Sequence, residues 1–361
     1  MQDLLIDQYT FLLKSCLILL NNVRYDNQYA NLLFLYTKCS NTVTYKEGLK
    51  MTRVSESQRE NRLVELIDFL ATGEGLSPSI LEGVQFMRSD KYTPPIPIIY
   101  EPCIVIVGQG RKIGYLGDQV YTYDPYNYLV LSVPLPFVCE TKASPEEPLL
   151  AVSIRVDPAT LGELLMEMDD DTSMSGTVPR GIYSTPLTGE LIDATVRLLE
   201  CLRSPIDSRI LGPQIMREII YRVLCGEQGG ALQAVAARHS RFSQIARVLR
   251  RIHTAYQQEM NIEALAGEAS MSVSTFHHNF KAVTSVSPLQ YLKSIRLHKA
   301  RMLMVQDGLT ASSASGKVGY ESASQFSREF KRFFGNSPAD EAIKLRALGP
   351  ASLHSVSNTG N

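Results

Sequence analysis

The spacing of hydrophobic residues changes character along the chain. Over residues 52–72 apolar side chains recur every three or four positions, which predicts an amphipathic helix. Between 92 and 157 short runs of Val, Ile, Leu and Tyr are separated by turns rich in Gly and Pro, a pattern that predicts the strands of a small β-barrel or sandwich. Apolar stripes at helical spacing follow over 187–202 and 208–226, and residues from 242 to 346 show only helical patterns.

These patterns predict an α+β fold in which a β-barrel with flanking helices precedes an all-α domain. The first 50 residues form either a helix with its own apolar face or an extension upstream of a working start at Met51, and we favour the second. The predicted segments are an N-terminal extension at 1–50, the strand-rich domain at 51–226, a linker at 227–241, the helical domain at 242–346 and a disordered tail at 347–361.

One segment of the helical domain occurs twice. Residues 272–288 and 322–338 share seven of seventeen aligned positions, and both copies carry Phe at i and i+4, so that two rings pack inward from one helix face. The opposite face carries polar and cationic groups that can bind base edges and phosphates. These groups are Ser274, Thr275, His277, His278 and Lys281 in the first copy, and Ser324, Gln325, Ser327, Arg328 and Lys331 in the second.

A long helix over 287–306 is predicted to join the two copies. About 17 residues at roughly 1.5 Å each hold the copies some 25 Å apart. Tilted packing brings this close to the ~34 Å between successive major grooves on one face of a duplex. The repeat therefore predicts two helix-turn-helix units that read successive grooves, with a protein-binding helical repeat as the alternative.

Charge is divided unevenly along the chain, although the net charge is only -1. Residues 241–346 hold 15 Lys and Arg against 8 Asp and Glu, and the remainder is acidic. A basic helical part behind an acidic strand-rich part indicates a polyanionic partner, and chance clustering of surface charge is the alternative.

Three strings carry a family resemblance in the helical domain. LAGEASMSVSTFHHNFK, SPLQYLKSIRLHKARMLM and VGYESASQFSREFKRFFGNSP make residues 242–346 resemble the AraC/XylS transcription regulators. Residues 92–165, with VGQGRKIGYLGDQVYTYD and YLVLSVPLP, look like the cupin-type N-terminal domain of one subgroup of that family. The resemblance implies a cupin-like sensory or dimerisation domain in front of two helix-turn-helix units that bind promoter DNA.

The resemblance also implies roles for residues of the repeat. Base-contacting positions of the family match Ser274, His277 and His278 in the first unit, and Ser324, Gln325, Ser327 and Arg328 in the second. Arg328 is the strongest candidate because a guanidinium can bind guanine bidentately, whereas Lys281 and Lys331 are expected near phosphates. His278 stands where the family often has Arg, which predicts a weaker contact. Ser285 replaces the Gly usual at the end of the first recognition helix.

The predicted strands carry candidates for a small-molecule site. Tyrosines supply apolar area with a hydroxyl group, and a cysteine with a depressed pKa could react with an electrophile. The candidates are Tyr115, Tyr121, Tyr123, Cys103 and Cys139. Tyrosines that only pack the strands, and buried inert thiols, are the alternatives.

Enzymatic activity is not expected. A metal-binding cupin needs several His residues, usually with Glu, and no His occurs before residue 239. No cofactor and no metal site are predicted. A cupin-fold metalloenzyme and a nucleoid protein that binds DNA without sequence preference remain the alternatives to a sequence-specific regulator.

The sequence as a whole therefore predicts a cytoplasmic, nucleoid-associated transcription regulator. Its expected partners are double-stranded promoter DNA, RNA polymerase, a small-molecule effector and a second copy in a homodimer. No membrane partner is expected, because the apolar stretch at 11–20 is too short to span a bilayer.

Overall fold

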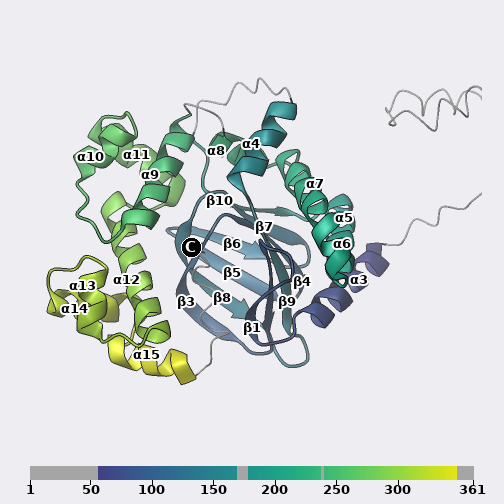
Figure 1. Cartoon of the computed structure of the whole chain (residues 1–361), viewed down its shortest axis with the longest axis horizontal. Coiled ribbons are helices and arrows are strands. Elements are labelled where there is room, and N and C mark those ends of the chain that lie inside the picture. The colour runs from purple at the N-terminus through teal and green to yellow at the C-terminus, as the bar shows by residue number, and fades with distance from the viewer. Residues whose placement is uncertain (1–55, 169–177, 237–239, 348–361) are drawn as a thin grey trace, which may run out of the picture. The chain divides into compact units, whose positions relative to one another are not determined.

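The computed structural model describes residues 56–168, 178–236 and 240–347, which belong to one compact unit (Figure 1). The expectations for residues 1–50 and for the tail beyond 347 lie outside the described residues. In the part described, no helix is both long and apolar enough to cross a membrane.

The strands form two sheets rather than one closed barrel. The larger sheet has the order β1 (Gly75–Pro78), β2 (Val84–Ser89), β9 (Leu149–Arg155), β4 (Cys103–Gln109), β7 (Asn127–Leu131) and β10 (Ile182–Pro186). The smaller sheet has the order β3 (Thr93–Tyr100), β8 (Leu135–Lys142), β5 (Arg111–Leu116) and β6 (Gln119–Tyr123). All the pairings are antiparallel. The α+β prediction is confirmed, and strands β1, β2 and β10 lie outside the range in which strands were predicted.

The larger sheet is apolar on both faces because both faces are covered. Along β4, Val105 and Val107 belong to the cluster between the two sheets, whereas Ile104 and Ile106 pack in a second cluster with the helices outside. All four are 0% exposed. This explains the continuous run CIVIV, since a strand with one solvated face alternates apolar and polar residues.

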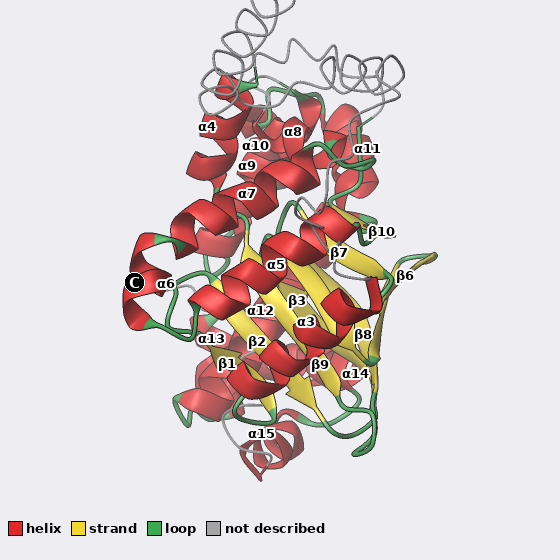
Figure 2. Ribbon diagram, turned by 90° about the vertical axis from the view of Figure 1, so that its right-hand side faces the viewer, coloured by secondary structure: helices red, strands yellow, loops and turns green. Residues whose placement is uncertain are grey.

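In the described residues six helices accompany the strand domain: α3 (Glu56–Leu70), α4 (Pro158–Glu167), α5 (Gly189–Cys201), α6 (Pro205–Ile210), α7 (Gly212–Leu224) and α8 (Gly230–Ala236). Helix α3 lies against β2, β4 and β9, with α5 beside it (Figure 2). Helix α4 begins where the sequence predicts, with Asp157 accepting a hydrogen bond from the Thr160 amide and Pro158 in the first turn. Helix α8 lies within the segment predicted as a linker.

The helical domain contains α9 (Arg241–Ala255), α10 (Ile262–Glu268), α11 (Val273–Thr284), α12 (Pro288–Gln306), α13 (Ala311–Lys317), α14 (Ala323–Phe334) and α15 (Pro338–Ala347). Helices α12 and α14 contact β3, and α12 also contacts β8, so this domain covers the smaller sheet. The prediction of two helix-turn-helix units joined by a long helix is confirmed.

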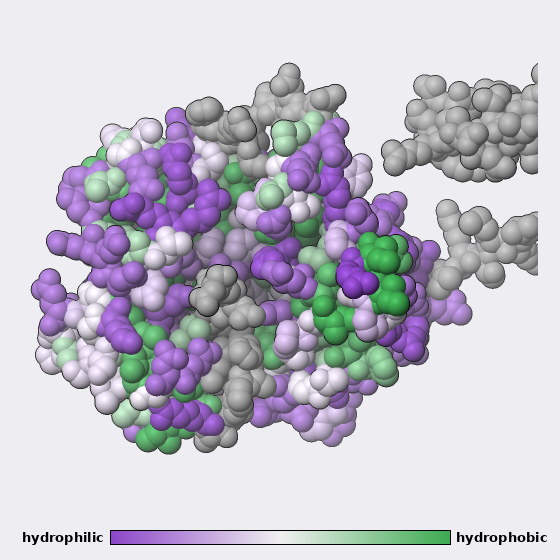
Figure 3. All heavy atoms as spheres, viewed as in Figure 1, coloured by the Kyte–Doolittle hydropathy of each residue, from purple (hydrophilic) through white to green (hydrophobic). Residues whose placement is uncertain are grey.

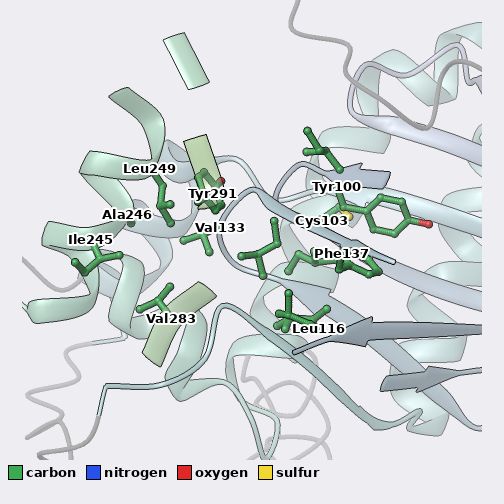
Figure 4. Packing of buried hydrophobic residues seen from close by; sticks show 14 of the residues in the cluster. Tyr100, Cys103, Leu116, Val133, Phe137, Ile245, Ala246, Leu249, Val283 and Tyr291 are labelled. Carbon is green, nitrogen blue, oxygen red and sulfur yellow. The ribbon is translucent and has the colours of Figure 1, made fainter. Parts of the chain in front are cut away.

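Apolar and polar contacts join the two domains. One buried cluster contains Val133 of the strand domain together with Leu249 and Val283 of the helical domain (Figure 4). Within it the Tyr291 hydroxyl donates to the Pro134 carbonyl over 2.7 Å. At the edge, the Gly181 amide donates to the Val283 carbonyl over 3.0 Å, so the end of α11 is tied directly to the strand domain.

Two buried imidazoles predict how stability depends on pH. Burial, assisted by Lys299, lowers the pKa of His253 to about 3, and burial beside Arg301 lowers the pKa of His298 well below its ordinary value. The unfolded chain takes up these protons near pH 6.5 but the folded protein does not. Stability is therefore present above pH 6.5 and is lost as the pH falls, by up to about 1.4 kcal/mol per pH unit for each imidazole.

Urea unfolding at pH 7.5, 6.5 and 5.5 measures this dependence, and the midpoint should fall across the series. The His253→Asn variant should show a shallower decrease than the wild type. The difference between the wild type and this variant gives the contribution of the His253 imidazole to the pH dependence. It separates that contribution from the one of Glu101, which lies 3.7 Å from His253 and whose own pKa is raised by burial. A wild-type midpoint that stays constant or rises towards pH 5.5 contradicts the prediction.

Candidate nucleic-acid interface

Helix α11 presents the first predicted contact surface. Its N-terminus is capped by Ser272, whose hydroxyl accepts a hydrogen bond from the Thr275 amide over 3.3 Å. Phe276 and Phe280 are 0% exposed and pack inward, as their spacing predicts. The predicted contact residues of this copy are all exposed on the helix: Ser274, Thr275, His277, His278 and Lys281.

Helix α14 repeats this arrangement. Ser322 caps it by accepting from the Gln325 amide over 3.3 Å, and Phe326 and Phe330 are 0% exposed. Of the residues predicted to contact DNA in this copy, Ser324, Gln325, Arg328 and Lys331 are exposed. Ser327 differs, because it is half-buried and its hydroxyl donates to the Ala323 carbonyl over 2.9 Å. Its hydroxyl is thus already engaged with the helix backbone.

A rigid helix separates the two surfaces. Helix α12 has 19 residues and begins with a capping box between Ser287 and Gln290. At about 1.5 Å per residue it is roughly 28 Å long. It is buried along much of its length, with Tyr291, Ile295 and Ala300 each 0% exposed.

One carboxylate lies on α14 beside the contact surface. Glu329 accepts hydrogen bonds from the Lys293 ammonium of α12 over 2.8 Å, from the Tyr320 hydroxyl over 2.9 Å and from the side-chain amide of Gln325 over 3.2 Å. Burial opposes its ionisation, but these hydrogen bonds outweigh burial and keep the pKa of Glu329 below its ordinary value. The sequence pattern does not single out Glu329, which orients the Gln325 side chain and is paired with the Lys293 ammonium.

The two recognition helices end in the same backbone conformation with different residues. Ser285 after α11 has φ 61°, and Gly335 after α14 has φ 84°, both left-handed. A side chain in this region is strained, whereas glycine adopts it freely. The expectation that position 285 favours a left-handed residue is thus explained by the C-cap geometry.

Replacing Ser285 by glycine should raise the free energy of unfolding by about 1 kcal/mol, because it removes this strain. The matched control is Gly335→Ser, which should lower it by a similar amount. A Cβ added at Gly335 meets nothing within 4 Å, so the control measures backbone strain without a clash. Urea unfolding followed by circular dichroism tests both changes. A neutral or destabilising S285G variant contradicts the account.

The candidates in the strand domain fall into separate groups. Tyr123 and Cys139 meet inside the sandwich, with 3.2 Å between hydroxyl and sulfur. Cys103 is buried in the same cluster, and burial raises the pKa of its thiol to about 12, so it is protonated and poorly nucleophilic at neutral pH. Tyr121 is half-buried and its hydroxyl accepts from Arg180 over 3.3 Å.

Tyr115 points to the opposite side of the smaller sheet. Its hydroxyl donates to Glu140 over 2.7 Å, and it lines a cavity of about 460 Å³ between this sheet and helices α12 and α14. The five strand-domain candidates are therefore not brought into one site. Among the described residues no group of three or more His, Cys, Asp or Glu side chains is placed to hold a metal ion.

The strand domain and the helical domain each match a model of a known protein family. Residues 80–231 match the family model described as the AraC-type transcriptional regulator N-terminus, and residues 265–341 match a helix-turn-helix domain. Among curated proteins, the chain is 26% identical over 147 residues to the HTH-type transcriptional activator RhaS of Escherichia coli O1:K1, covering 35% of this chain and 53% of RhaS. It is 35% identical over 95 residues to the HTH-type transcriptional regulator AlkR of Acinetobacter baylyi, covering 26% of this chain and 31% of AlkR. The chain thus spans about half the length of RhaS and about a third of the length of AlkR.

Similar solved structures include ToxT of Vibrio cholerae with a bound unsaturated fatty acid. That similarity has 12% sequence identity and a TM-score of 0.49, and it covers 72% of this chain and 94% of ToxT. The DNA-binding domain of AdpA in complex with a target DNA is 29% identical with a TM-score of 0.29, covering 30% of this chain and 96% of that domain.

Proposed function

Because the chain belongs to the AraC family of transcription regulators, we propose that it is a sequence-specific DNA-binding regulator whose α11 and α14 read successive major grooves. The observation that carries the proposal is the pair of capped recognition helices. Each buries its two Phe rings and exposes polar and cationic side chains. A buried helix between them fixes their separation.

Selection of duplexes from a random pool with the full-length protein, followed by footprinting, tests this function. The expected result is a discrete site with two protected segments about one helical turn apart on the same face. Uniform protection along the DNA would favour a nucleoid protein without sequence preference. No enrichment over competitor DNA at modest salt would overturn specific recognition.

Regulation is proposed to act through the contacts between the two domains. The hydrogen bond from Gly181 to Val283 and that from Tyr291 to Pro134 connect the strand domain to α11 and α12. An effector bound in the strand domain, or self-association, would change these contacts and so the presentation of the two recognition helices to DNA or to RNA polymerase.

A surface suited to self-association lies on α6. Ile206 and Ile210 are 61% and 60% exposed, and Leu211 follows at 49%. Figure 3 shows hydrophobic surface on the side of the molecule where Figure 1 places α6. Asp207 and Arg209 are exposed between these apolar side chains, and a two-fold arrangement of two copies would pair them across the interface. We therefore place the proposed homodimer contact here.

The protein acts in the cytoplasm at the nucleoid and catalyses no reaction. Metal analysis of the purified full chain tests the competing cupin enzyme, since a stoichiometric transition metal would favour it.

A further inference from the structure

A lysine side chain points into the interior of the β-sandwich. Along β5, Lys112 alternates with Arg111 and Ile113 and so faces the same side as Leu116, which is 3% exposed. Its cross-strand partners are Tyr123 and Thr141, both buried. Lys112 thus occupies an inward position of β5, whereas Tyr115 of the same strand occupies an outward one.

The ammonium group of Lys112 has no acidic partner there. Its Nζ lies 3.9 Å from the Met87 sulfur and 5.6 Å from the centre of the Tyr100 ring. Within the described residues no carboxylate oxygen lies within 4.0 Å of it, since Lys112 takes part in none of the ion pairs found there. A lysine surrounded by buried side chains is normally paired with an anion, because desolvating an unpaired charge is costly.

A cavity of about 200 Å³ lies beside this amine. Met87, Tyr100, Cys139 and Leu149 line it and are each at most 6% exposed, which gives it apolar walls around the single charge. Tyr100 points away from the helical domain in Figure 4, and Cys103 lies next to it in that view. The chemistry of the cavity is that of a binding site with one cationic end and an apolar body.

The acidic and basic groups at the outer part of the cavity do not neutralise Lys112. Glu74 also lines the cavity, but its two oxygens accept hydrogen bonds from the Ser89 hydroxyl at 2.8 Å and the Asp90 amide at 3.1 Å. Arg88 is paired with Asp68, and Lys91 is exposed. The net charge around the entrance therefore does not oppose the approach of an anion.

We propose that this cavity binds a small organic carboxylate. Its carboxylate pairs with the Lys112 ammonium, and its apolar part packs against Tyr100, Met87 and Leu149. The inference deepens the proposed effector-binding role and names the ligand class. Leu345 of α15 lines the same cavity, so a bound ligand would touch both the strand domain and the helical domain.

Calorimetric titration of the full chain with hexanoate tests the site, with hexanamide as the neutral analogue of the same shape and inorganic phosphate as an anion without an apolar part. Hexanoate should bind at least tenfold more tightly than either control. Lys112→Met, which keeps the chain length but removes the charge, should weaken hexanoate binding at least tenfold. Lys142→Met is the matched control, because Lys142 lies on the neighbouring strand β8 but is exposed, and it should bind like the wild type.

Three outcomes would overturn the proposal: no binding of hexanoate, equal binding by Lys112→Met, or binding of phosphate that matches hexanoate. The Lys112→Met variant should unfold at the same urea concentration as the wild type or a higher one, so lost binding cannot be attributed to misfolding. Footprinting of the same protein preparation separates the two hypotheses. Specific DNA protection without hexanoate binding rejects the carboxylate site alone, and the reverse result rejects the DNA-binding function alone.

Discussion

Replacing Arg301 by methionine is expected to lower the free energy of unfolding by roughly 3–5 kcal/mol, because it leaves a buried carboxylate without its charged partner. The Arg301 guanidinium lies 3.6 Å from Glu341, and both side chains are 8% exposed. The guanidinium also lies 4.4 Å from the centre of the Phe334 ring and donates to the Pro97 carbonyl over 3.4 Å. Burial lowers the pKa of Arg301 to about 10, so it remains charged at neutral pH.

Urea unfolding followed by circular dichroism measures this loss, and two further variants define its origin. Arg301→Met combined with Glu341→Leu removes both charges and should recover most of the stability, since an apolar pair of similar volume can replace a buried ion pair. Arg251→Met removes an arginine from a more exposed pair with Glu268 and should cost less than about 1 kcal/mol. If Arg301→Met itself lowered the free energy of unfolding by less than about 1 kcal/mol, the buried Glu341 carboxylate would not need the Arg301 charge for its stability.

The recognition helices could be predicted in detail because their signals are local. A cap residue, two Phe side chains four positions apart and a Ser-Pro start of the next helix all fall within one short segment. The structure adds one exception to the exposed face, Ser327, whose hydroxyl turns back to the Ala323 carbonyl. The hydroxyl of any serine inside a helix can either donate to the carbonyl four residues earlier or face solvent, so the residue type alone does not predict which of the two occurs.

The edge strands of the larger sheet are not predicted by the sequence, because they lack such local signals. Strands β1 and β10 are short, and the segments GLSP and IYSTP carry no run of alternating apolar residues. Strand β10 joins β7 across about 50 residues, and a local pattern does not specify so distant a pairing. Strand β1 pairs with the nearby β2, but as an edge strand it has only this one neighbour to fix it.

The contacts between the two domains also cannot be predicted from local sequence patterns. Tyr291 bonds to Pro134 across 157 positions, and Arg301 reaches Pro97 across 204. The same limit applies to the strand-domain candidates. Tyr115 and Tyr123 differ in which face of the smaller sheet they occupy, and that depends on the register of β5 with β6. The tyrosines could be proposed as candidates from their residue type, but the sequence does not show which face of the sheet each one occupies.

Replacing Arg328 by alanine is expected to remove sequence discrimination at one base pair. An exposed guanidinium on α14 can donate two hydrogen bonds to one guanine in the major groove, and losing them costs about 1–3 kcal/mol on the preferred duplex. The loss should be small on a duplex with a different base pair at that position. Binding isotherms on the selected site and on its single-base variants measure this difference. A uniform loss on all duplexes would reassign Arg328 to a phosphate contact.

Three further variants make this test specific. Lys331→Ala should weaken binding to every duplex and reduce the slope of log K against log salt by about 0.9, since one phosphate contact is lost. His278 occupies the position equivalent to Arg328 in the first copy. His278→Ala should cost less than Arg328→Ala, because an imidazole cannot make the bidentate contact that a guanidinium makes with guanine. Lys91→Ala, an exposed lysine of the strand domain, should leave both affinity and salt slope unchanged. The ordering of these four variants depends on α11 and α14 both reaching DNA, so an equal and negligible effect of all four would reject the two-groove model.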